Sequence, residues 1–214
     1  EDGFLQKVRD LANQNDIVLI FDECTSGFRE TFGGIYKKYD VEPDMIMYGK
    51  TIANGYALTA VVGRREIMEA AQKTFISSTF WTERIGPTAA LKTLEVMEGL
   101  KSWDVITENG EKMREGLKKI AGEYNLRITI SGIPALTTYT FDYDENLKYK
   151  TLITQEMLKK GFLASTHFYA CTEHSDEHFR KYFEALAEVY DLISSCEKGN
   201  ANIEDLLEGP VAHS

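Results

Sequence analysis

Two apolar runs in the first quarter of the chain each end in a charged residue. The run at 17–21 (IVLIF) leads into Asp22, and the run at 44–48 (DMIMY) leads into Gly49 and Lys50. Short apolar runs that are bounded by turn residues are typical of buried strands. We therefore predict two buried strands, each of which delivers a charged side chain at its carboxyl end.

Helical and strand patterns alternate around these two runs. Apolar residues recur at helical spacing at about 3–14, which predicts a helix that leads into the first strand. The run LTAVVG predicts a third strand at 58–63, and a further helix is expected to begin near Arg65. A longer helix is expected at 87–100, where Pro87 suits the first turn. This alternation predicts an α/β unit with a mostly parallel sheet.

The second half of the chain is predicted to form a separate α+β domain. Its strands alternate apolar and polar residues, as in LRITIS and ALTTYTF, which favours an antiparallel sheet with one covered face. The expected elements are a helix at 103–124, strands at 126–131 and 135–141, a helix at 150–160, a short strand at 162–164 and a last helix that is opened by Ser175. We therefore expect one domain at 1–101 and a second at 102–214.

Asp22 and Lys50, at the ends of these two predicted strands, are the candidate functional residues. Open α/β sheets bind ligands in the crevice outside the carboxyl ends of their strands, which is where both residues are expected. A lysine there can form a Schiff base with an aldehyde cofactor, and an acid can keep a pyridinium nitrogen protonated. The alternative is that both are ordinary surface residues.

Composition and charge exclude several other classes of protein. The net charge is -10, with 24 basic and 34 acidic residues, which argues against a general nucleic-acid or anionic-membrane surface. No apolar run approaches the roughly 20 residues that span a bilayer. The three cysteines follow no disulfide or zinc spacing, which favours reduced thiols in a cytoplasmic protein. His174 and His178 are close in sequence, but the predicted helix begins between them, so we expect no metal site.

Two longer motifs resemble a known family. The segments DECTSGFR at 22–29 and EPDMIMYGKTIANGYALTAVVGRREIM at 42–68 resemble the class III, fold-type I pyridoxal-phosphate aminotransferases. The closest subgroup is the glutamate-1-semialdehyde aminomutase-like proteins. The likeness continues through STFWTERIGPTAALKTLEVM at 78–97 and, more weakly, into the second half. It covers nearly the whole chain but only half of a full-length family member. The resemblance therefore implies a C-terminal half, with part of the large cofactor-binding domain followed by the small domain.

The resemblance also implies residue roles. Lys50 is expected to form the Schiff base with pyridoxal phosphate and to move the proton between the substrate Cα and the cofactor C4′. Asp22 is expected to pair with the pyridinium nitrogen. Thr82 is expected to contact the cofactor phosphate of the neighbouring subunit in a homodimer. The family's glycine-threonine and glycine-asparagine-proline pattern is matched imperfectly here, so Ser78 and Thr79 are alternatives.

Three further features have less specific interpretations. Glu23 follows Asp22 directly and points another way in a continuous strand, so we expect a structural role. Arg29 is a candidate for binding a substrate carboxylate, and an ordinary solvated or paired arginine is the alternative. The segment TFISSTFWTERIG at 74–86 is rich in aromatic residues that an interface would cover, namely Phe75, Phe80 and Trp81.

The function that the resemblance implies is that of an aminotransferase or an aminomutase. Such an enzyme moves an amino group from a small-molecule donor to a carbonyl acceptor, or within one substrate molecule. The family's amino-terminal half supplies the phosphate-binding loop and the aromatic residue that stacks on the cofactor, so the chain by itself is expected to be inactive. The alternative is a non-catalytic scaffold or a degenerate remnant, which the intact pair Asp22 and Lys50 argues against, because a scaffold needs no buried lysine. Neither the substrate nor the choice between the two reactions follows from the sequence.

Overall fold

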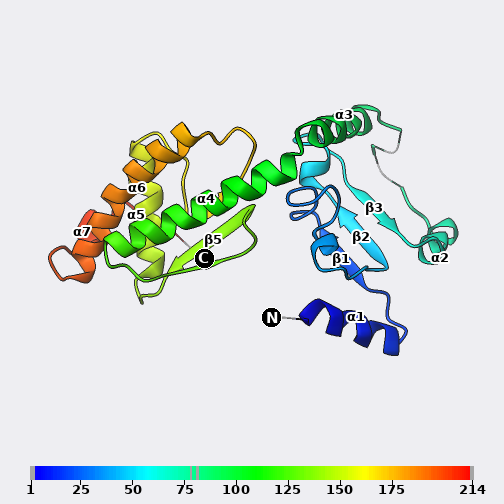
Figure 1. Cartoon of the computed structure of the whole chain (residues 1–214), viewed down its shortest axis with the longest axis horizontal. Coiled ribbons are helices and arrows are strands. Elements are labelled where there is room, and N and C mark those ends of the chain that lie inside the picture. Colours follow the sequence, from blue (N-terminus) through cyan, green and yellow to red (C-terminus); the bar gives the residue numbers. More distant parts are fainter. Residues whose placement is uncertain (1–2, 78, 81, 213–214) are drawn as a thin grey trace. The chain divides into compact units, whose positions relative to one another are not determined.

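The chain forms two compact units, one after the other in the sequence. The computed structural model describes residues 3–77, 79–80 and 82–212 (Figure 1). The first unit extends to Asp104, and the second begins at Val105. Each unit is built on its own three-stranded sheet.

The sheet of the first unit has the strand order β1-β2-β3. Its strands are β1 (Ile20–Glu23), β2 (Met45–Tyr48) and β3 (Ala60–Gly63). As expected, β1 and β2 run parallel, whereas β2 and β3 run antiparallel. A parallel connection needs roughly a dozen or more residues to cross the sheet, and the chain at 49–59 is too short for one.

The first strand is less buried than its apolar run predicts. Ile17, Val18 and Ile20 are 55%, 42% and 48% exposed, and within the described residues β1 pairs with β2 alone. The inner strand β2 has the expected burial, because Ile46 and Tyr48 are each 8% exposed. The prediction of a buried first strand is therefore wrong for this chain. A continuous apolar run is covered only where both faces of the sheet are packed.

A buried ion pair fixes the first helix, α1 (Phe4–Gln14), beside the start of β2. Arg9 Nη1 lies 2.9 Å from Asp44 Oδ2, and the two side chains are 10% and 9% exposed. Asp44 also accepts the backbone N–H of Leu19 at 2.8 Å and pairs with Arg64 at 3.1 Å. Burial raises the pKa of Asp44, but the Leu19 hydrogen bond and the two arginines outweigh it and hold that pKa below its usual value. The carboxylate therefore stays charged and joins three segments of the chain.

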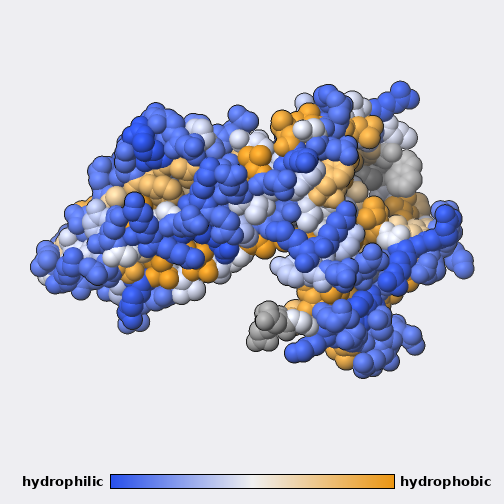
Figure 2. Space-filling view, in the orientation of Figure 1, coloured by the Kyte–Doolittle hydropathy of each residue, from blue (hydrophilic) through white to orange (hydrophobic). Residues whose placement is uncertain are grey.

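The other helices of the first unit follow the sequence pattern, with one difference in length. The helix expected from Arg65 is short, α2 (Arg65–Met68), and continues as a 3-10 turn, η3 (Glu69–Lys73). The long helix α3 (Ile85–Leu100) contains Pro87 in its first turn, as expected. Figure 2 shows apolar side chains gathered over α3. The exposed apolar residues of α3 are Ile85, Leu91, Val96 and Leu100.

The second unit packs helices against an antiparallel sheet. Its elements are α4 (Ser102–Glu123), which begins just before the unit, β4 (Ile128–Ser131), β5 (Leu136–Phe141), α5 (Asn146–Lys159), β6 (His167–Tyr169), α6 (Asp176–Glu197) and α7 (Ile203–Leu206). The strand order is β4-β5-β6, and both pairs are antiparallel. The core contains Leu117 of α4, Leu152 of α5 and Leu186 of α6, each 0% exposed. The antiparallel sheet predicted from the alternating strands is confirmed.

One strand of the second unit forms later in the sequence than predicted. The strand expected at 162–164 is not formed, and Leu163 is 97% exposed. Pairing begins only at Thr166, whose carbonyl accepts the N–H of Tyr139 at 3.0 Å, and β6 follows. The helix before this segment ends as predicted, because Gly161 has a φ of +85° that suits a helix terminus. Contacts with β5 therefore decide where the last strand forms.

Candidate active site

The parallel pairing of β1 and β2 brings their carboxyl ends to the same edge of the sheet. Asp22 lies opposite Met47 in the register of the two strands. Lys50 follows the end of β2 directly after Gly49 and opens the 3-10 turn η2 (Lys50–Ile52). Both candidate residues are thus placed at the edge where open α/β sheets bind their ligands.

Asp22 is an exposed carboxylate that is held by the backbone of the following turn. The N–H of Cys24 donates to Asp22 Oδ1 at 3.0 Å. This hydrogen bond is the main cause that lowers the pKa of Asp22 below its usual value. A hydrogen bond from the Cys24 thiol and the positive charge of Lys50 act in the same direction, and burial opposes them. Asp22 is therefore negatively charged at neutral pH.

Lys50 is exposed and has an uncommon backbone conformation. Its φ is +44°, a region that costs an L residue on the order of 1–3 kcal/mol and is found most often at functional sites. Its Nζ donates to Thr25 Oγ1 at 2.5 Å. The preceding Gly49 is closely packed, since a Cβ there would lie 3.3 Å from Cys24 Sγ. The expectation of a buried lysine is wrong for this chain, because Lys50 lies beyond the end of the strand rather than inside the sheet.

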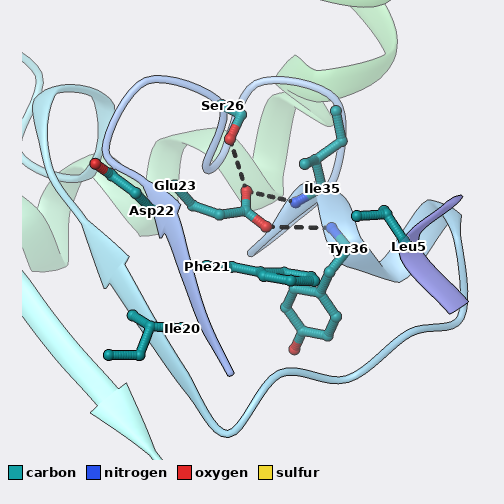
Figure 3. Close-up of a pocket in the computed structure, with 8 residues that line it drawn as sticks. All are labelled: Leu5, Ile20, Phe21, Asp22, Glu23, Ser26, Ile35 and Tyr36. Carbon is teal, nitrogen blue, oxygen red and sulfur yellow. Dashed lines mark hydrogen bonds between the residues drawn. The ribbon is translucent and has the colours of Figure 1, made fainter. Parts of the chain in front are cut away.

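Glu23 has the structural role that the sequence predicts. It is 2% exposed, and its carboxylate accepts the backbone N–H of Ile35 at 2.7 Å and of Tyr36 at 3.2 Å. It also accepts the hydroxyl of Ser26 at 2.9 Å. Figure 3 shows Asp22 and Glu23 on opposite sides of β1, as the alternation of a strand requires. Glu23 therefore fixes the loop that follows β1, and Asp22 remains available at the surface.

A hollow of about 250 Å³ lies beside β1. Its lining residues are Leu5, Ile20, Phe21, Asp22, Glu23, Ser26, Ile35 and Tyr36 (Figure 3). Lys50 is not among the described residues that line it. This hollow therefore does not unite the two candidate residues, which are exposed together at the sheet edge instead.

Thr82 is exposed in the turn before α3. In the part of the chain that the structure describes, no hydrogen bond or ion pair joins Thr82 to Asp22 or Lys50. The alternative Thr79 is also exposed, and the alternative Ser78 lies outside the described residues. The role of Thr82 at the phosphate stays a prediction.

The start of α3 is already occupied by an acid. The carboxylate of Glu83 accepts the backbone N–H of Gly86 at 3.0 Å and also that of Ile85. Free N–H groups at a helix start attract anions, but here a carboxylate binds them. A phosphate near Thr82 would therefore need donors other than these two N–H groups.

Two contacts of the site were not predicted. Thr25 and Cys24 lie in the turn after β1, where they contact Lys50 and Asp22 respectively. The signal in the sequence was the run of small polar residues, CTS, directly after the acid pair. Arg29, which the sequence suggested for a substrate carboxylate, donates its Nε to the Thr25 carbonyl at 2.6 Å and so supports this turn.

The two histidines of the second unit make local hydrogen bonds, His174 Nδ1 with the backbone N–H of Cys171 at 3.1 Å and His178 in the cap of α6. The N–H of His178 donates to Ser175 Oγ at 3.3 Å, and its Nδ1 lies 3.0 Å from the Glu173 carbonyl oxygen.

The described residues contain no group of three or more histidine, cysteine or acidic side chains that could hold a metal ion. They also contain no helix that is long and apolar enough to cross a bilayer.

Comparison with known proteins decides the family. The family model described as "Aminotransferase class-III" matches residues 1–189. The chain belongs to the class-III aminotransferases. The resemblance carried by the segments at 22–29 and 42–68 is thereby confirmed.

The class-III chain matches curated relatives with different reactions. A 3-aminobutyryl-CoA aminotransferase from Cloacimonas acidaminovorans (strain Evry) is 38% identical over an alignment of 192 residues, and the match covers 87% of this chain and 46% of that protein. A glutamate-1-semialdehyde 2,1-aminomutase from Methanothermobacter thermautotrophicus is 32% identical over an alignment of 206 residues, and the match covers 88% of this chain and 49% of that protein. The class-III chain thus spans about half the length of the curated relatives it matches.

Solved transaminase structures share the fold of the class-III chain. The FumI protein of Sphingopyxis sp. MTA144, described in its PLP internal aldimine form, has a TM-score of 0.85 at 20% identity. That match covers 95% of this chain and 50% of FumI. A structure described as a transaminase with PLP bound has a TM-score of 0.81 at 22% identity, over 94% of this chain and 50% of that chain. The expected partial fold-type I architecture is therefore confirmed.

Proposed function

We propose that this chain supplies the reactive lysine and the ring-binding aspartate of a pyridoxal-phosphate-dependent aminotransferase or aminomutase. The observation that carries the proposal is the placement of Asp22 and Lys50 at one edge of the sheet, at the ends of adjacent parallel strands. Asp22 is charged, and Lys50 presents a primary amine whose hydrogen-bond partner is a neutral hydroxyl.

The residues present fit this cofactor. Asp22 is exposed, and its Oδ1 accepts the backbone N–H of Cys24. An exposed, charged carboxylate suits a protonated ring nitrogen. In the described part of the chain no acid lies within ion-pair distance of Lys50 Nζ, so the amine is available to an aldehyde. When bound, pyridoxal phosphate draws electron density from the substrate carbon that carries the amino group.

Lys50 has two tasks in the proposed reaction, and Asp22 has one. Lys50 Nζ would hold the cofactor at its aldehyde carbon, and as a free amine it would move a proton between the substrate Cα and the cofactor C4′. Asp22 keeps the proton on the ring nitrogen, because a nearby negative charge favours the protonated form.

The substrates we propose are a small-molecule amino donor and a carbonyl acceptor, or one molecule that serves as both. The relatives include an aminotransferase and an aminomutase that match over similar shares of this chain, 87% and 88%. We therefore propose the step that the two reactions share, the movement of an amino group through the cofactor, and neither of the named substrates.

The assignment of the two halves of the chain to domains is also a proposal. Residues 1–101 would belong to the large cofactor-binding domain and residues 102–214 to the small domain. The separate sheets and the division of the chain after Asp104 support this assignment. We further propose a cytoplasmic location, which the free state of the three cysteines supports, since thiols persist in reducing compartments.

Trapping with borohydride tests the assignment of Lys50. The natural protein is incubated with pyridoxal phosphate, reduced, digested and mapped by mass spectrometry. The pyridoxyl mass is expected on the peptide that contains Lys50. Lys101 is a matched internal control, because it is exposed and also has a positive φ, +48°. Labelling of Lys101 in place of Lys50 contradicts the proposal, and a complete lack of label favours the non-catalytic scaffold.

We propose in addition that the protein acts as a homodimer in which Thr82 reaches the phosphate site of the neighbouring subunit. The segment before α3 exposes large aromatic side chains, with Phe75 at 94% and Phe80 at 63% exposure. Apolar residues are also exposed along α3 (Figure 2). Large exposed apolar surfaces are typical of sites that a partner covers. Trp81, the third aromatic residue of the segment, lies outside the described residues.

Mixing two impaired variants tests this arrangement. Thr82→Ala and Lys50→Ala are each purified, mixed under conditions that exchange subunits, and assayed. In a mixed dimer one site would carry both substitutions and the other site neither, so activity is expected to return in part. If Thr82 serves its own subunit, mixing recovers nothing beyond the rate of the more active variant. Thr74→Ala, which alters another exposed threonine of the segment at 74–86, is the control for a general effect of the substitution.

A further inference from the structure

We propose that Thr25 is a positioning residue, whose hydroxyl holds the amine of Lys50 in place through both of its protonation states. The inference rests on the proposed function, because it concerns the same lysine. Its basis is the hydrogen bond from Lys50 Nζ to Thr25 Oγ1 at 2.5 Å. Thr25 lies in the turn after β1, and Lys50 in the turn after β2, so the bond joins the two loops of the site.

The turn that carries Thr25 is fixed independently of Lys50. On one side, the buried carboxylate of Glu23 binds the hydroxyl of Ser26 at 2.9 Å. On the other side, Arg29 Nε donates to the Thr25 carbonyl at 2.6 Å. The hydroxyl of Thr25 is therefore presented from a rigid turn, and it does not simply follow the lysine.

The lysine side of the contact is fixed as well, but only through its backbone. Gly49 is packed against Cys24, and Lys50 itself has a φ of +44°. The side chain beyond this point is a flexible four-carbon stem that is exposed to solvent. The hydrogen bond to Thr25 is what confines the amine at the end of that stem.

A hydroxyl suits a lysine that must gain and lose a proton. A carboxylate in this place would favour the charged amine and oppose its loss of a proton. A threonine hydroxyl accepts a hydrogen bond from an ammonium group, and after a rotation about its C–O bond it donates one to a neutral amine. Thr25 therefore orients Lys50 Nζ without selecting one of the two states.

Competitive labelling of the amine tests this role without any cofactor. The natural protein at its full length is freed of cofactor and treated with formaldehyde and cyanoborohydride, and methylation is followed by peptide mass spectrometry. The rate at Lys50 is divided by the rate at Lys101, the exposed lysine of similar backbone conformation. In Thr25→Val, which keeps the shape of the side chain, this ratio is expected to rise about 2- to 10-fold, as the loss of one hydrogen bond predicts. In Thr25→Ser the ratio is expected to stay at the wild-type value.

An unchanged ratio in Thr25→Val overturns the proposal, and so does a rise in Thr25→Ser that equals the rise in Thr25→Val. A thermal melt verifies that each variant is folded, and Thr25→Ala is judged by the same ratio should Thr25→Val fail to fold. With cofactor bound, Thr25→Val is expected to lower kcat with little change in KM, and Thr25→Ser to restore it. Because the labelling needs no cofactor, its outcome is separate from that of the borohydride experiment, which alone decides the proposed function.

Discussion

Replacing Lys50 by alanine is expected to lower the turnover of the natural protein by at least about 10⁴-fold, because bonding to the cofactor and transfer of the proton depend on the same amine. The fold is expected to persist, since Lys50 is exposed and its side chain makes a single hydrogen bond, to Thr25, among the described residues. The measurement is the initial rate with a panel of primary amines as donors and 2-oxo acids as acceptors, together with the thermal midpoint of each variant.

Two further variants test whether the loss of turnover is specific to the amine of Lys50. Lys101→Ala removes another exposed lysine of positive φ and is expected to leave turnover unchanged. Lys50→Arg keeps the positive charge but cannot lose its proton under these conditions, so it is expected to be as impaired as the alanine variant. Turnover of Lys50→Ala within about 10-fold of the wild type would be too small a loss for a general base and would remove Lys50 from the proposed mechanism.

Replacing Asp22 by asparagine is expected to lower turnover by about 10²- to 10³-fold, the loss typical of removing one group that stabilises a transition state electrostatically. Asparagine retains an oxygen that can accept the N–H of Cys24, so the turn after β1 is expected to stay intact. The ring nitrogen of the cofactor would lose its charged partner, although the lysine remains. Turnover and thermal midpoint are measured on the same preparations.

The control for Asp22→Asn is Asp40→Asn, which removes one negative charge from another exposed position of the first unit and is expected to retain full turnover. The pKa of Asp22 lies below its usual value, chiefly because of the Cys24 hydrogen bond. Its carboxylate is therefore charged throughout the neutral range, and no loss of activity between pH 6 and 8 is attributable to its titration. An Asn variant with nearly wild-type turnover would show that the ring nitrogen does not depend on this acid.

The sequence was sufficient to predict the edge that carries the candidate site. Apolar runs followed by Asp22 and Lys50 indicated two strands that end in charged residues, and the parallel pairing of β1 and β2 places them together. This prediction succeeded because it depends on local pattern and on the short reach between paired strands. The role of Glu23 followed in the same way, from the alternation of side chains along β1.

The rest depends on contacts that no local pattern contains. The exposure of Ile17 and Val18 is set by which elements cover β1, and not by their own hydrophobicity. The position of β6 is set by its register against β5, which leaves Leu163 exposed although its neighbours are apolar. The bond between Thr25 and Lys50 depends on the paths of two separate loops, so only coordinates reveal it.

The uncovered side of β1 has a practical consequence for handling this chain. Exposed strand edges are templates to which a strand of another molecule can add, and proteins commonly block them with lysine or proline. In the described structure this edge has Ile17, Val18 and Ile20 beside it, each more than two-fifths exposed. We therefore expect this uncovered edge to promote association of the 214 residues in solution, against the mutual repulsion that a net charge of -10 provides.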